Sequence, residues 1–100
     1  MRVVILVLGL PPGTPQPTAN RFTQKFYGQD TTTRGGNYRY RKAGLLDSVP
    51  HRRLRRGVVI LRERDLTRVT RFLDEWKARY EVRVIRPTSD DLSDLTQARS

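Results

Sequence analysis

Two short stretches, residues 3–8 and residues 58–61, carry an apolar side chain at every position. Neither stretch alternates with polar residues, so each is typical of a central strand that is covered on both faces of its sheet. The second stretch follows Gly57 and has arginine-rich residues on either side. These two stretches therefore predict a sheet with two buried central strands and positive charge at the ends of one of them.

The rest of the chain predicts two main helices and two outer strands. Thr18 can cap a helix that buries Ala19, Phe22 and Phe26 on one face and ends at Gly28. Asp65 can cap a longer helix over about residues 66–80, because apolar side chains recur there at helical spacing. Those side chains are Leu66, Val69, Phe72, Leu73, Trp76 and Tyr80. Residues 37–41 alternate polar or aromatic and basic side chains, as an edge strand does, and residues 81–86 form a last strand before Pro87.

The order of these elements is β-α-β-β-α-β. We therefore predict an α+β fold over residues 1–86, namely a ferredoxin-like sandwich in which a four-stranded antiparallel sheet carries two helices on one face. The first and third strands are central, and a long insertion separates the second strand from the third. Residues 87–100 form a short acidic C-terminal tail, in which Ser89 can cap a helix.

Two helices can cover only one face of this sheet, although its central strands are apolar on both faces. A bare apolar face is rare in soluble monomers, so a second layer is expected. It can come from a helical turn containing Leu45, Leu46 and Val49, from Leu92 and Leu95 of the tail, or from a second copy of the chain. We favour a homodimer, with local cover by the long insertion as the alternative.

Composition narrows the chemistry and the partners. The chain of 100 residues has no cysteine, which excludes disulfides and thiolate metal sites. Its formal net charge of +10 predicts a polyanionic partner. Seventeen of the 20 basic residues are arginine, which favours bidentate phosphate contacts, although a GC-rich genome produces the same bias. The apolar residues 3–8 are too short to span a membrane, so we interpret them as a strand of a cytoplasmic protein without a membrane partner.

Positive charge is concentrated in residues 34–64, which hold ten basic and two acidic residues. Such a segment is typical of phosphate-backbone binding, whereas the alternative is a merely solvated surface. The candidate contacts are Arg34, Arg39, Arg41, Lys42, Arg52, Arg53, Arg55 and Arg56. Tyr38 and Tyr40 either stack on bases or pack in the core. We predict a non-catalytic protein that binds DNA or RNA largely independently of sequence, with no cofactor and no metal.

Three other hypotheses for the function are consistent with the sequence. The size, charge, architecture and expected dimer resemble the small ferredoxin-like proteins of CRISPR adaptation, a family with a metal-binding Asp at the end of its first strand. Here that strand ends in Leu8-Gly9-Leu10 and the nearest following acid is Asp30. A phosphodiester nuclease would depend on Asp30 or on His51, the single histidine, which is otherwise a surface loop residue. The protein could instead be an assembly subunit of a larger ribonucleoprotein particle.

The acidic tail contains Asp90, Asp91 and Asp94. These carboxylates either bind a divalent ion or serve as helix-capping charges that complement the basic segment. A tail folded over residues 52–56 would compete with a bound polyanion.

Overall fold

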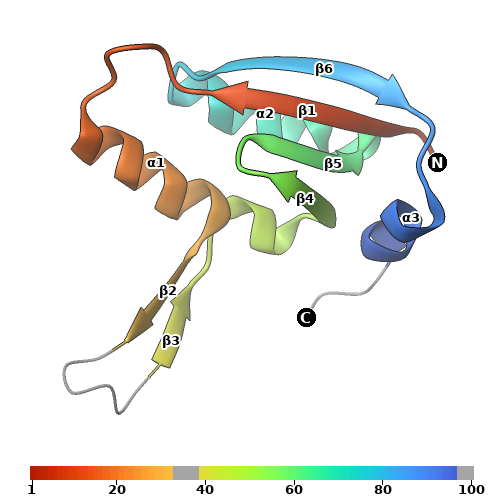
Figure 1. The fold of residues 1–100 in the computed structure, drawn as a ribbon, viewed down its shortest axis with the longest axis horizontal. Coiled ribbons are helices and arrows are strands. Elements are labelled where there is room, and N and C mark those ends of the chain that lie inside the picture. The colour runs from red at the N-terminus through yellow and green to blue at the C-terminus, as the bar shows by residue number, and fades with distance from the viewer. Residues whose placement is uncertain (33–38, 97–100) are drawn as a thin grey trace.

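A computed structural model of the chain describes residues 1–32 and 39–96 and shows a mixed α+β fold built on a four-stranded antiparallel sheet (Figure 1). The strand order is β4 (His51–Arg55), β5 (Val58–Arg62), β1 (Val3–Gly9) and β6 (Arg79–Ile85). The two apolar stretches thus form the two central strands, as predicted. Both strands bury side chains on each of their faces, Val4 and Leu6 on one and Val3 and Ile60 on the other, which is consistent with the absence of polar alternation in their sequences.

The main core lies on one face of the sheet, the first face, which carries Val4 and Leu6 of β1. Helices α1 (Gln16–Tyr27) and α2 (Leu66–Glu75) both contribute to this core. Their buried side chains there are Phe22 and Phe26 of α1 and Val69 and Leu73 of α2. The predicted burial of Phe22 and Phe26 is therefore confirmed.

The opposite, or second, face of the sheet carries Val3, Val7 and Ile60 and is covered at one end by helix α3 (Ser89–Thr96). Leu95 of α3 is buried against Val3 and Ile60, so the C-terminal tail supplies part of the expected second layer. Val7 remains 47% exposed at the other end of the same strand.

The expected long insertion between the second and third strands of the main sheet is wrong, because a tight turn joins β4 directly to β5. The extra residues lie between α1 and β4 instead, where β2 (Gln29–Thr32) and β3 (Arg39–Lys42) form a second, two-stranded sheet. The prediction that residues 37–41 form an edge strand of the main sheet is therefore wrong. The part of that segment that the structure describes pairs with β2, and β4 forms the edge next to β5 because a tight turn joins the two strands. The hairpin projects from the body of the molecule (Figure 1), and the radius of gyration is 14.7 Å. A compact domain of this length has a radius of gyration of about 13 Å.

A 3₁₀ turn, η1 (Leu45–Ser48), leads from the hairpin to β4 and confirms the predicted helical turn. Leu46 and Val49 are buried in the first-face core, so this segment does not cover the second face. The alternative that the insertion covers the second face is therefore wrong for the described residues, because Leu46 and Val49 pack with Val4 and Leu6 on the first face.

Several helix ends differ from the sequence prediction. Helix α1 begins at Gln16, before Thr18, because Pro15 and Pro17 fit the first turn of a helix. Helix α2 ends at Glu75, and a second short 3₁₀ turn, η2 (Glu63–Asp65), precedes it. Lys77 has a positive φ of 55°, which reverses the chain into β6, so Tyr80 lies on a strand. Thr88, rather than Ser89, caps α3 by accepting a hydrogen bond from the Asp91 amide.

No helix within residues 1–32 and 39–96 is long and apolar enough to cross a membrane.

Candidate nucleic-acid interface

The arginines of residues 52–55 lie on strand β4 and not in the long insertion that the sequence predicts before the third strand. Arg52 pairs with Ile60 and so lies on the second face, whereas Arg53 pairs with Val59 and lies on the first face. A bulge at Leu54 shifts the register and returns Arg55 to the second face, opposite Val58. The run of basic residues is therefore divided between the two sides of the sheet.

Arg53 stacks on Tyr27, the last residue of α1. Its guanidinium carbon lies 4.0 Å from the centroid of the tyrosine ring. The Tyr27 hydroxyl accepts a hydrogen bond of 2.8 Å from the amide of Gly57, in the turn between β4 and β5. Tyr27 thus holds both Arg53 and the turn, a role that was not predicted from the sequence. The sequence does contain a pattern that indicates the position of Tyr27: it follows Thr23 by four residues and Ala19 by eight, which places all three on one side of α1.

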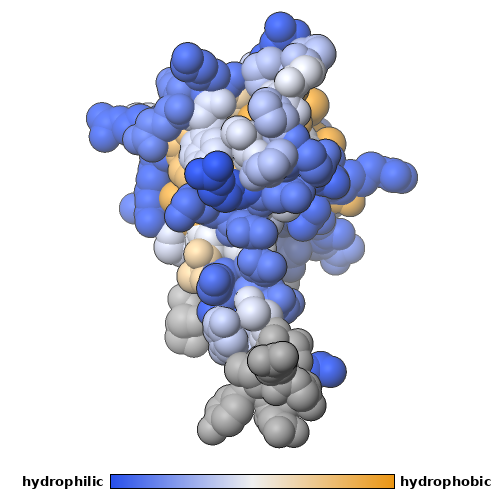
Figure 2. Space-filling model, turned by 90° about the vertical axis from the view of Figure 1, so that its left-hand side faces the viewer, coloured by the Kyte–Doolittle hydropathy of each residue, from blue (hydrophilic) through white to orange (hydrophobic). Residues whose placement is uncertain are grey.

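Arg56 lies in the same turn and reaches α1 one helical turn before Tyr27. Its Nη2 atom is 3.5 Å from the Thr23 hydroxyl. Gly57, the next residue of the turn, adopts a φ of +81°, and a Cβ atom there would lie 2.7 Å from the Leu8 carbonyl oxygen, so glycine lets the turn lie close to β1. Arg53 and Arg56 are consequently neighbours along α1. Hydrophilic side chains dominate the surface of the molecule on the α1 side (Figure 2).

Arg52, on the other side of the sheet, forms ion pairs with α3. Its Nε atom lies 3.5 Å from Asp91 and 3.8 Å from Asp94. Asp91 is only 6% exposed, and its carboxylate also accepts a hydrogen bond from the Thr88 amide at the start of α3. The acidic tail therefore neutralises the charge of one arginine of the basic segment. Asp91 does this while it also accepts the hydrogen bond that caps its own helix.

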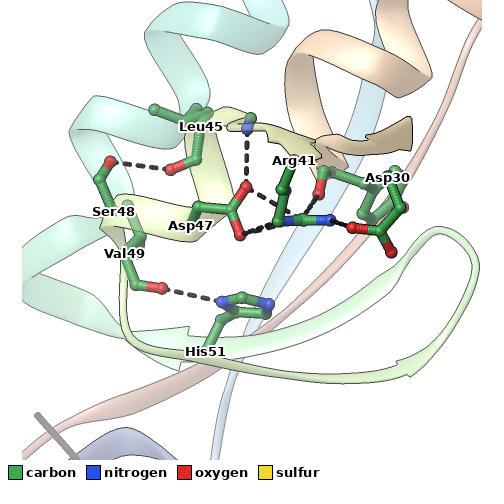
Figure 3. A network of polar contacts seen from close by, with 9 residues as sticks. Asp30, Arg41, Leu45, Asp47, Ser48, Val49 and His51 are labelled. Atoms are coloured by element: carbon green, nitrogen blue, oxygen red, sulfur yellow. Dashed lines mark hydrogen bonds and ion pairs between the residues drawn. The ribbon is translucent and has the colours of Figure 1, made fainter. Parts of the chain in front are cut away.

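Arg41 is the centre of a polar network at the base of the hairpin (Figure 3). It donates hydrogen bonds to Asp47 at 2.9 Å, to Asp30 at 3.1 Å and to the Tyr27 carbonyl oxygen at 2.7 Å. These bonds to Asp47 and Asp30 raise the pKa of the Arg41 guanidinium. Arg41 therefore fixes the hairpin to α1 and η1, and two carboxylates compensate its charge.

Asp47 is held from two sides in this network. Burial by itself would raise the pKa of its carboxyl group, but the hydrogen bonds from the Gly44 amide and from Arg41 outweigh that effect. The pKa of Asp47 therefore lies below its ordinary value. Asp47 is accordingly a charged anchor that joins η1 to β3.

The remaining candidates on the hairpin point into solvent. Arg39 and Lys42 are exposed, and Tyr40 is 48% exposed, so Tyr40 is not a core residue. Thr31 and Tyr40 face each other across the hairpin, on the side away from Arg39 and Arg41. Arg34 and Tyr38 lie outside the described residues.

Ion pairing separates the candidate arginines into two groups. Arg41 and Arg52 are paired with carboxylates. Within residues 1–32 and 39–96, no carboxylate pairs with the other described candidates. These are Arg39, Lys42, Arg53, Arg55 and Arg56. They are the cations best placed to meet an external anion.

The groups considered for catalysis are engaged in structural contacts. The Nδ1 atom of His51 lies 2.8 Å from the Val49 carbonyl oxygen, and because a carbonyl only accepts, Nδ1 carries the proton of this bond. His51 is half-buried on β4 and does not lie in a surface loop. Asp30 pairs with Arg41. The part of the chain that the structure describes contains no cluster of three or more His, Cys, Asp or Glu side chains suited to a metal ion.

Comparison with protein-family models, with curated proteins and with solved structures finds no match to this chain. The candidate interface accordingly rests on the geometry of its own side chains.

Proposed function

We propose that this protein binds nucleic acid non-catalytically, by contacts to the phosphate backbone. Arg53 and Arg56 form the centre of the binding surface, and Arg39 and Lys42 extend it onto the projecting hairpin. The observation that carries the proposal is the position of Arg53 and Arg56 side by side along α1, with no carboxylate partner among the described residues. Arg55 adds charge at the far side of the same strand.

The chemistry of these side chains suits phosphate. An arginine stacked on an aromatic ring keeps its N–H donors at the edge of the guanidinium plane, where a phosphate can accept two of them. The ring also limits the rotation of the Arg53 side chain, so less conformational entropy is lost on binding. Contacts of this type read charge and not base identity, so binding should be largely independent of sequence.

The proposal is tested by the salt dependence of binding. We would measure fluorescence anisotropy of labelled duplex DNA, single-stranded DNA and RNA over a series of salt concentrations, with and without magnesium. Each phosphate contact on duplex DNA adds about 0.9 to the slope of log affinity against log salt, so the double variant Arg53→Gln/Arg56→Gln should lower that slope by about 2. The affinity of this variant should fall at least about tenfold at low salt.

A matched control carries the same change of charge at the other end of the sheet. Arg64 and Arg86 follow β5 and β6 near Val3, whereas the β4–β5 turn lies near Leu8. The variant Arg64→Gln/Arg86→Gln should therefore keep the wild-type slope. Equal losses in both double variants would show a diffuse charge effect and contradict the proposed surface. Failure to bind any of the three polymers would refute nucleic-acid binding and leave an acidic protein as the partner class.

We also propose that the main sheet is a ferredoxin-like split βαβ core with the β2–β3 hairpin inserted before its second strand. The antiparallel order β4-β5-β1-β6 supports this assignment, as do the positions of α1 after β1 and α2 after β5. A solved structure of the protein in which α1 and α2 lay on opposite faces would rule it out.

A homodimer through the second face of the sheet remains part of the proposal. Val7 is 47% exposed on a central strand, next to the half-buried Ile5 and Val58. Pairing two such faces would remove this apolar surface from water. Sedimentation that gave the mass of a single chain at micromolar concentration would exclude the dimer.

A further inference from the structure

A pocket of about 220 Å³ opens beside Arg56, between the end of β1, α1 and the β4–β5 turn. Leu8, Leu10, Ala19 and Phe22 give it an apolar wall. Among the described residues that line it, Arg56 is the only charged one, and Thr23 supplies a hydroxyl. The pocket therefore combines an apolar interior with one cation.

The pocket is held in place by the contacts of Gly57. The Gly57 carbonyl accepts a hydrogen bond of 2.8 Å from the Leu8 amide, and its own amide donates to the Tyr27 hydroxyl at 2.8 Å. These two bonds fix the turn to β1 on one side and to α1 on the other. Ala19 leaves space in the wall because its side chain is a single methyl group. Such a site is formed before a ligand arrives.

The dimensions and polarity of the pocket limit what can enter. A cavity of about 150 Å³ accepts a benzene molecule, so a pocket of this volume has room for a planar heterocycle. The Thr23 hydroxyl donates a hydrogen bond to the Ala19 carbonyl at 3.0 Å, and its oxygen accepts a long one from Arg56 at 3.5 Å. The oxygen therefore still has a lone pair with which to accept a hydrogen bond from a ligand. The cation at Arg56 favours a ligand whose ring is attached to a phosphate.

We propose that this pocket receives one unpaired base of a nucleic-acid strand, with the phosphate attached to that nucleotide bound by Arg56. This inference rests on the proposed function and adds a preference for strands with unpaired ends. A base inside a duplex is stacked and paired, so only an unpaired or extruded base can enter. Arg53 lies beside the pocket, on Tyr27, and is placed to bind a neighbouring phosphate.

The test compares two DNA duplexes of equal length and equal phosphate number. One has paired blunt ends, and the other has mismatched terminal bases that splay apart. Wild-type protein should bind the splayed duplex about tenfold more tightly, since stacking one base on protein contributes ~1–3 kcal/mol. The variant Ala19→Leu fills the pocket and should reduce this preference to less than about twofold. The fluorescence of 2-aminopurine at the splayed position should change on binding wild type but not on binding this variant.

Asn20→Leu is the matched control, because Asn20 is exposed on α1 next to Ala19 and outside the pocket lining. It should retain the preference. If thermal melting shows that Ala19→Leu does not fold, the smaller substitution Ala19→Val provides the same comparison. Equal binding of both duplexes by wild type, or a preference that survives filling of the pocket, would overturn the inference and leave backbone binding intact. Loss of binding to every nucleic acid would instead refute the proposed function.

Discussion

The guanidinium of Arg53 lies 4.0 Å above the ring of Tyr27, although the two residues come from different elements, β4 and α1. The hydroxyl of the same tyrosine accepts a hydrogen bond from the Gly57 amide, and its backbone carbonyl oxygen accepts one from the Arg41 guanidinium. One side chain and its backbone thus connect the hairpin, the edge strand and the β4–β5 turn. The position of the proposed phosphate-binding arginines depends on this residue.

The two parts of the Tyr27 side chain are separable by mutation. Tyr27→Phe keeps the ring under Arg53 and removes the acceptor for Gly57, so it should cost about 1 kcal/mol of stability and leave nucleic-acid affinity within about twofold of wild type. Tyr27→Leu removes the ring as well and should weaken binding by about 2–5-fold, in line with an exposed cation–π contact. Urea unfolding and anisotropy measure the two effects. A larger loss of affinity for the phenylalanine variant than for the leucine variant would contradict this division.

Asp94 should limit nucleic-acid binding by pairing with Arg52. Asp94→Asn frees part of the Arg52 charge and should raise affinity, with a salt slope steeper by at most about 1 because one more phosphate contact becomes possible. Asp90→Asn is the control, since Asp90 is an exposed residue of the same helix with no ion pair in the described part of the chain. Equal gains from the two variants would mean that only net charge matters.

Asp47 should contribute a pH-dependent part of the stability. Its pKa is lowered in the folded protein, whereas an aspartate in an unfolded chain titrates at about 3.9. The contribution is therefore present above that pH and is lost as the pH falls through the folded-state pKa. Urea unfolding from about pH 6 to about pH 2 should show this loss in wild type and a shallower decline in Asp47→Asn. Asp30→Asn, at the more exposed carboxylate on the same arginine, should follow wild type closely.

Gly57 should be sensitive to substitution. Gly57→Ala places a Cβ at a φ of +81° and 2.7 Å from the Leu8 carbonyl oxygen, so it should destabilise the protein by about 1–3 kcal/mol. Gly9→Ala is a suitable comparison, because a Cβ there meets nothing within 4 Å and the backbone does not have a positive φ. Chemical denaturation of the two variants gives the difference directly. Comparable stability of both would show that the turn can relax around the added methyl group.

The sequence predicted those parts of the fold that depend on local burial. Residues 3–8 and 58–61 are apolar throughout, and both faces of these central strands carry buried side chains, with Val7 as the exposed exception. That apolar pattern is visible in the sequence without any partner. The edge strand could not be recognised in the same way. Both β3 and β4 are short and basic, and which of them joins the main sheet depends on the tight turn at Gly57 and on pairing of β3 with β2.

The end of α2 was missed for a different reason. Trp76 and Tyr80 continue the helical spacing of α2, but Tyr80 lies on β6, where its hydroxyl donates to Asp74 at 2.9 Å. Alternation on a strand and periodicity on a helix both bring residues four apart to one side, so spacing alone could not separate them.

The sequence by itself determined the two central strands, the apolar face of α1 and the concentration of positive charge in residues 34–64. Only the tertiary structure decided which of those charges are free to act. Arg52 pairs with Asp91 and Asp94, and Arg41 pairs with Asp47 and Asp30. Arg53 instead stacks on the ring of Tyr27, which does not neutralise its charge. Several of these partners are distant in the chain, and strand alternation sends neighbouring arginines to opposite faces of the sheet. Whether an arginine can bind an external anion depends on whether the fold brings a carboxylate next to it, and the order of residues in the sequence does not contain that information.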